Sequence, residues 1–424
     1  MSRRAALVAD AVLRHRLGLL AVAAVLEGLA LTRDGAVPAD LAAFSATGRL
    51  LLQGRLDAVY ADPFTQAGPL ELIAASLALP AGSRAGELGL TALYVLGNLA
   101  AVTAVVLGGR VVRTLTGLPA SPVLELLAGL ATIAWLVPGQ LWSGHLAGLA
   151  VPVTWLAAGT LAVRGRTQAA GVLVSALCGA LIGVASAWEP WGIVAAPLLL
   201  IDRRPRRLAL GVLALVATAA FAYAPFALTG RFALFDQRWP VSPATLLHLL
   251  RPDLGEATWW FRLLQGGLAV TACAAVALVL GRRRDVVWLA PLAAVLARLL
   301  LDPTGFAYYW VPAQVLGLVG VTMLNPRRPW RRLVPVAAMG YLPFLQWGTW
   351  AVVQLLVTSG VLVVAVAGLR EAGAGVSAGR AGRSRAPSPP RTPAEADRSC
   401  CSCPRSFPAT ARSSPGAGRA QRAQ

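Results

Sequence analysis

Two carboxylates and a histidine are the residues best suited to proton chemistry in this otherwise apolar sequence. Asp40 lies in the first long polar segment, just before apolar residues that recur at helical spacing. Glu71 lies inside a short apolar run, and His145 lies in the polar turn GQLWSGH. A carboxylate can deprotonate a hydroxyl group, and one within a membrane needs a partner or a water-filled cavity. These three residues are therefore site candidates, although an aspartate at the start of a helix is also an ordinary N-cap.

An arginine and two tyrosines form a second set of candidates. Arg298 lies near the end of an apolar run, and Asp302, Tyr308 and Tyr309 follow it. A guanidinium group binds phosphate through two hydrogen bonds, so Arg298 could hold a lipid phosphate. Arg298 could instead snorkel or pair with Asp302 at i+4, and the tyrosines could belong to an interfacial aromatic belt.

Further polar and aromatic residues fall on the same side of the expected topology as these candidates. They occur at two short turns and in the second long polar segment: Gln140, Trp142, Trp188, Glu189, Trp191, Asp236, Arg238, Trp239 and His248. Each is a weak signal alone. Their shared side favours one outward-facing site.

The composition is typical of a protein with many membrane spans. Of the 424 residues, 57% are hydrophobic and 13% are charged, and the mean hydropathy is +0.64. Soluble domains contain about 25% charged residues. The net charge of +19 comes from arginine alone, because the chain has no lysine. The arginines lie in short loops and a tail, so they predict topology and contacts with anionic lipid headgroups rather than nucleic-acid binding.

The apolar runs predict an all-α, polytopic transmembrane bundle with about 12 spans (range 10–13) and both termini in the cytoplasm. The expected spans cover residues 17–31, 88–109, 123–138, 146–163, 169–187, a short run before Arg203, 208–228, 260–280, 286–300, 308–324, 333–348 and 350–369. The outer loop 32–87 is expected to carry an amphipathic helix at 38–53. The run at 69–79 is too short to cross a bilayer of about 30 Å, so it is expected to be re-entrant or to lie on the surface.

Two regions are expected, a membrane region at 1–370 and a disordered cytoplasmic tail at 371–424. The tail is rich in arginine, proline and serine and has almost no apolar periodicity. Its Cys400, Cys401 and Cys403 are followed by no histidine, so the spacing does not predict a zinc site. The sequence also has no glycine-rich loop typical of nucleotide binding, so no cofactor is expected, and no residue is assigned to a metal site.

The outer-loop residues resemble those of the GT-C superfamily of membrane glycosyltransferases. More narrowly, the chain is similar to the bacterial polyprenol-phosphate-mannose-dependent α-1,2-mannosyltransferases. The resemblance rests on Asp40 with Phe44, on Gly54 with Tyr60, on Pro69-Leu70, and on the later segment from Arg298 to Tyr309. It covers residues 17–370 approximately.

The resemblance implies a hexosyltransferase of the plasma membrane whose active site faces outward. It implies that Asp40 acts as general base on an acceptor hydroxyl. It also implies that the donor is a sugar carried on polyprenyl phosphate, with mannose as the leading candidate. Arg298, Tyr308, Tyr309, Glu71 and His145 are then expected to bind substrate, and the acceptor to be a lipid or cell-wall glycan. Two alternatives stay open, a transporter or flippase of a lipid-linked precursor and a non-catalytic membrane scaffold.

Overall fold

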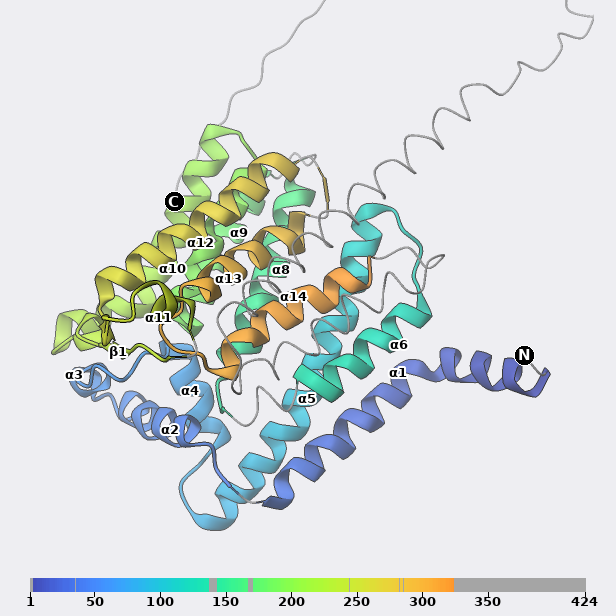
Figure 1. Ribbon diagram of the computed structural model, residues 1–424, viewed down its shortest axis with the longest axis horizontal. Helices are drawn as coiled ribbons and strands as arrows, with labels where there is room; N and C mark the ends of the chain where they lie inside the picture. Colours follow the sequence, from blue (N-terminus) through green and yellow to red (C-terminus); the bar gives the residue numbers. More distant parts are fainter. Residues whose placement is uncertain are drawn as a thin grey trace, which may run out of the picture. The chain divides into compact units, whose positions relative to one another are not determined.

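A computed structural model describes residues 3–34, 36–136, 143–166, 171–243, 245–281, 283–284 and 286–323 (Figure 1). The expected spans at 333–348 and 350–369 and the tail at 371–424 lie outside these residues. Gln140 and Trp142 lie outside them as well.

The described chain is almost entirely helical, as the sequence predicts. Five of its helices are long and apolar enough to cross a membrane: α5 (Ser83–Thr116), α8 (Ala147–Gly165), α9 (Gly171–Trp188), α10 (Pro205–Thr229) and α12 (Trp259–Leu280). Each of them covers one of the expected spans. Among the remaining helices, α1 (Arg3–Leu31) packs along α5, and η1 (Thr32–Asp34) continues it.

The shorter apolar helices are α4 (Pro69–Ala78), α6 (Pro122–Ala131), η3 (Pro190–Ile201), α13 (Val286–Leu300) and α14 (Val311–Val321). With 10 residues, α4 is about 15 Å long, so the prediction of a helix too short to cross the bilayer is confirmed. The expected span at 123–138 forms α6 and then the π-helical turn η2 (Thr132–Leu136). The expected span at 308–324 begins as the 3-10 turn η5 (Ala307–Trp310) and continues as α14.

The first polar segment folds into α2 (Ala39–Leu52) and the single turn α3 (Leu56–Val59), which precede α4. The amphipathic helix expected at 38–53 is therefore present. Helix α2 buries Leu41 and Phe44 against α4, and the two helices approach closely at Gly48. A Cβ atom at residue 48 would lie 2.0 Å from the Leu72 carbonyl oxygen, so only glycine permits this contact.

The second polar segment contains two strands that the sequence did not predict. Strand β1 (Trp239–Pro240) pairs antiparallel with β2 (Glu256–Ala257), and the turns η4 (Ala233–Phe235) and α11 (Leu246–Leu250) flank β1. The segment is hydrogen-bonded at two distant points. The Ala233 amide donates to the Tyr60 carbonyl (2.8 Å), and the Ser242 amide donates to the Pro303 carbonyl (2.8 Å). This loop therefore joins the first polar segment to the segment that precedes η5.

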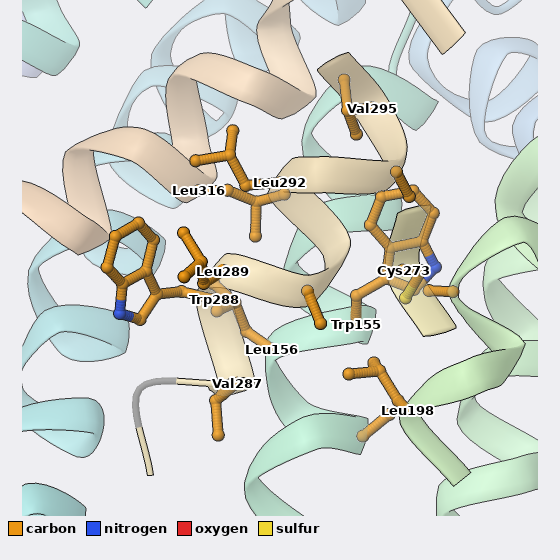
Figure 2. Packing of buried hydrophobic residues seen from close by; sticks show 14 of the residues in the cluster. Trp155, Leu156, Leu198, Cys273, Val287, Trp288, Leu289, Leu292, Val295 and Leu316 are labelled. Atoms are coloured by element: carbon orange, nitrogen blue, oxygen red, sulfur yellow. The ribbon is translucent and has the colours of Figure 1, made fainter. Parts of the chain in front are cut away.

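The largest cluster of buried apolar residues lies among α8, α9, η3, α12, α13 and α14. Figure 2 shows Trp155, Leu198 and Leu292 among the residues that fill it. The Trp155 indole is fully buried and donates to the Gly192 carbonyl (2.8 Å), which fixes η3 against α8. A tightly packed helical core of this kind can hold the loops between its helices in fixed positions.

Candidate functional site

Asp40 does not cap α2, so the capping alternative is wrong. Pro38 occupies the N-cap position, and no side chain caps the helix. Asp40 lies instead in the first turn, where the helix dipole stabilises a negative charge. Its carboxylate oxygen Oδ2 lies 3.0 Å from His145 Nε2, and 31% of its side chain is exposed. Asp40 is thus a hydrogen-bonded carboxylate that other molecules can still reach.

A tight turn before α8 places His145 against the start of α2. Gly144 has a φ of +74°, and a Cβ atom there would lie 2.6 Å from Leu41 Cβ and 2.9 Å from the Leu41 amide nitrogen. The turn therefore needs glycine for its backbone conformation and for its contact with α2. Since Leu41 adjoins Asp40, this contact brings the imidazole to the carboxylate.

Glu71 lies on the other side of the His145 ring and is fully buried. Its Oε1 accepts a hydrogen bond from the Ala147 amide (3.1 Å) and lies 3.9 Å from His145 Nδ1. Its Oε2 has no hydrogen-bond partner among the described residues. Helix α4 is held in place at its start, where the Gly68 amide donates to the Trp188 carbonyl (3.0 Å).

Two aromatic rings enclose the imidazole of His145. Tyr308 stacks on it with 3.9 Å between ring centroids and 11° between planes, and Phe44 meets it edge-on at 5.0 Å. The rings shield both faces of the imidazole, although 13% of the side chain stays exposed. Its two nitrogens face the carboxylates of Asp40 and Glu71.

Tyr308 also connects the histidine to Arg298. The rings of Tyr308 and Tyr309 are 4.6 Å apart, and the Arg298 guanidinium carbon lies 4.8 Å from the Tyr309 ring and 4.4 Å from the Trp191 ring. Aromatic faces attract such a cation. Nη1 of Arg298 is buried and has no hydrogen-bond partner among the described residues. It is therefore an unsatisfied donor within this part of the structure.

Asp302 pairs less closely with Arg298 than with a residue the sequence analysis did not select. Its Oδ2 lies 3.8 Å from Arg298 Nη2, so the expected i+4 pair is present, but it lies 3.0 Å from Arg262 Nη1. Thr304 donates to the other oxygen of Asp302 from both its amide and its hydroxyl group (3.0 Å each). The buried Arg298 and the half-buried Arg262 thus share one carboxylate. Arg262 lies early in an expected span, and an arginine in that position was the signal that could have found it.

Glu189 is a further carboxylate, half-buried at the junction of α9 and η3. It interacts electrostatically with Arg298 and His145. Burial raises the pKa of Glu189, and the positive charges of Arg298 and His145 partly oppose that rise. Glu189 therefore lies within electrostatic reach of both halves of the site.

Burial also raises the pKa of Glu71, and the neighbouring His145 opposes the rise. Burial lowers the pKa of His145, but the hydrogen bond to Asp40 and the charges of Glu71 and Glu189 outweigh it, so the net shift is upward. Both shifts have the same consequence. The folded protein retains protons here at a pH where the unfolded chain would release them.

The structure brings all six predicted site residues into one series of contacts: Asp40, Glu71, His145, Tyr308, Tyr309 and Arg298. Of the residues in the second polar segment, Trp239 joins them through a cation–π contact with Arg262 (4.5 Å). Asp236 and Arg238 do not, because they form exposed ion pairs with Arg231 and Glu256.

Within the described ranges, no group of three or more histidine, cysteine or acidic side chains is arranged to hold a metal ion. No family model, curated protein or solved structure matches this chain.

Proposed function

We propose that this chain is an integral-membrane glycosyltransferase that moves a hexose from polyprenyl phosphate to a lipid or cell-wall glycan, with mannose as the leading candidate for the hexose. One observation carries the proposal. A partly exposed carboxylate, Asp40, is joined through His145, Tyr308 and Tyr309 to a buried guanidinium, Arg298, whose Nη1 has no hydrogen-bond partner among the described residues. A base and a phosphate-binding cation are the two groups that such a transfer needs.

The proposed reaction assigns a separate role to each group. Asp40 removes the proton of the acceptor hydroxyl as that oxygen forms a bond to the anomeric carbon of the sugar. The bond from the anomeric carbon to the phosphate oxygen breaks, and its electron pair leaves with polyprenyl phosphate. Arg298 stabilises the growing negative charge of the phosphate. Arg262 adds positive charge nearby, because Asp302 neutralises only one of the two arginines.

We further propose that this site faces outward at the plasma membrane, in a GT-C-like bundle of about 12 spans with both termini in the cytoplasm. The support is the alternation of arginine clusters with apolar runs along the sequence. Donor and acceptor would both be reached from the outer leaflet, where a lipid-linked sugar needs no nucleotide site.

The base assignment is tested by Asp40→Asn in membranes from cells producing the full chain. The probe is polyprenyl phosphate carrying radiolabelled mannose, and the label is counted in the endogenous lipid and wall-glycan fractions. An amide cannot accept the proton, so the transfer rate should fall at least about 100-fold. The matched control is Asp62→Asn, because Asp62 lies in the same outer loop but is exposed and only caps a turn by accepting from the Phe64 amide.

Normal transfer by Asp40→Asn would refute the base assignment. Loss of transfer in both variants, with normal membrane insertion, would mean that the loop rather than the carboxylate is required. Absence of transfer by the wild-type membranes at every donor tested would refute the proposed function.

A second candidate, a transporter or flippase of a lipid-linked precursor, is favoured by the buried Glu71 and the half-buried His145 and Glu189. Such groups mark proton-coupled transport in membrane proteins. Reconstituted vesicles containing a fluorescent polyprenyl-phosphate lipid distinguish the two. A transporter would move the lipid between leaflets without changing it, and Asp40→Asn would retain this activity. A transferase would not move the lipid between leaflets, in the wild type or in the variant.

A further inference from the structure

The His145 ring is placed between two carboxylates that it cannot satisfy equally in its neutral form. A neutral imidazole has one N–H donor and one acceptor nitrogen. Nε2 lies 3.0 Å from Asp40 Oδ2, and Nδ1 lies 3.9 Å from Glu71 Oε1. If both carboxylates were ionised and the ring neutral, one lone pair would face a negative oxygen in a buried site. That arrangement is unfavourable, so the group of three must carry an additional proton.

The location of this proton follows from the role proposed for Asp40, on which the inference rests. Asp40 must be ionised to accept a proton, so Nε2 carries a hydrogen and donates it to Oδ2. The additional proton then belongs to the other side of the ring. It resides either on Nδ1, beside an ionised Glu71, or on Glu71, beside a neutral ring.

The surroundings oppose loss of this proton. The His145 ring is faced by negative or neutral groups from four elements: Asp40 from α2, Glu71 from α4, Glu189 from the start of η3 and Tyr308 from η5. Removing the proton would leave the carboxylates of Asp40, Glu71 and Glu189 around a neutral ring, with Arg298 as the compensating cation. Glu71 is fully buried, so water cannot screen its charge.

We propose that His145 and Glu71 are positioning residues for Asp40. His145 holds Oδ2 of Asp40 through Nε2–H, which leaves Oδ1 to meet the acceptor hydroxyl, and the proton that Glu71 and Nδ1 retain keeps the ring in this donor state. When that proton is lost at alkaline pH, the neutral ring has one hydrogen for two ionised carboxylates, so an Nδ1–H form facing Glu71 competes with the Nε2–H form, and the hydrogen bond to Asp40 is weakened. The roles parallel those of a metal-binding histidine whose second nitrogen is fixed by an outer carboxylate.

Four variants test this arrangement by transfer of labelled mannose from pH 5 to pH 9. His145→Ala should lower kcat about 10- to 100-fold with little change in the donor KM, the usual effect of losing an outer partner. His145→Gln should restore part of the loss, because its amide can donate to Asp40. Glu71→Gln places an amide donor toward Nδ1 as the protonated acid does, so it should lose less rate than Glu71→Leu and flatten the alkaline decline of the wild type.

A second measurement does not depend on activity. The unfolding temperature of the detergent-solubilised full chain should fall as the pH rises above about 6.5, because the folded state holds a proton that the unfolded state has released. Glu71→Gln should have a smaller slope. Two results would overturn the inference and leave the proposed function intact. One is an equal slope of unfolding temperature against pH in the wild type and Glu71→Gln. The other is a pH–rate profile that neither His145→Ala nor Glu71→Gln changes, while Asp40→Asn is inactive. Normal transfer by Asp40→Asn would instead refute the base assignment, and absence of transfer by the wild type would refute the proposed function.

Discussion

At the scale of single residues, the two ends of the site differ in how their charges are held. Asp40 is partly exposed and has one oxygen bound by His145. Arg298 is 8% exposed and lies over two aromatic rings, and among the described residues its compensating charges are Asp302 at 3.8 Å and Glu189. A buried cation without a close ion pair is costly to maintain, which is consistent with the proposed role in binding an anion.

Replacing Arg298 with lysine tests this interpretation. Lysine retains the charge but loses the flat group that stacks on rings and donates two parallel hydrogen bonds. We expect the donor KM of Arg298→Lys to rise about 10-fold, the effect of losing 1.4 kcal/mol of binding free energy. Arg231→Lys is the matched control, because Arg231 forms an exposed pair with Asp236. Steady-state transfer at varied donor concentration gives the comparison, and an unchanged KM in Arg298→Lys would contradict phosphate binding by Arg298.

At the scale of elements, close backbone contacts bring the site residues together. The turn at Gly144 packs closely against α2 at Leu41, and α2 packs closely against α4 at Gly48. Each contact excludes a Cβ atom, and each lies near a candidate residue in the sequence. The elements are therefore spaced by glycine at the points where Asp40, His145 and Glu71 must meet.

Gly144→Ala should separate the cost of the backbone conformation from the cost of the contact. Gly144 and Gly54 have nearly the same φ, +74° and +75°, but a Cβ atom at residue 54 would meet nothing within 4 Å. Gly54→Ala should therefore lose only the conformational term of about 1–2 kcal/mol. Gly144→Ala should be less stable than Gly54→Ala and should also lose transfer activity, because the clash with Leu41 moves His145. Thermal unfolding and transfer rates measure both effects, and equal losses in the two variants would show that the contact is unimportant.

The helices themselves were largely predictable from the sequence, and the pairing of side chains was not. Apolar periodicity predicted 286–300 and 260–280, and α13 and α12 cover them closely. It could not show that Arg262 on α12, rather than Arg298 on α13, is the closer partner of Asp302, because that choice depends on how the two helices pack. The hairpin of β1 and β2 was missed because its strands are only two residues long and leave no alternating pattern.

At the scale of the whole molecule, the proposed topology places the site and the arginine-rich loops on opposite sides of the membrane. Asp40 belongs to the first polar loop, and Arg203 to Arg207 form the densest cationic run between two of the described helices, η3 and α10. If Asp40 is external, that run is cytoplasmic, because the parity of the crossings between them fixes its side.

Cysteine labelling of intact cells tests this topology. In a background without the native cysteines, Phe64→Cys and Arg204→Cys are each treated with a membrane-impermeant maleimide. Both positions are exposed in the structure, so accessibility depends only on the side of the membrane. Phe64→Cys should react in intact cells, and Arg204→Cys should react only after permeabilisation. The reverse pattern would place Asp40 in the cytoplasm and rule out transfer at the outer leaflet.

The hydrogen bonds of the second polar loop have a consequence for how such a protein can diversify. The loop is hydrogen-bonded to Tyr60, directly after α3, and to Pro303, directly after Asp302, so in the proposed site it helps to set the distance between Asp40 and Arg298. Inserting or deleting residues between Ala233 and Ser242 would change the separation of those two residues without replacing any residue that meets the substrate. Under the proposed function we expect the length of this loop to limit acceptor size, so a chimera that exchanges it should change which acceptors are used while Asp40 and Arg298 stay the same.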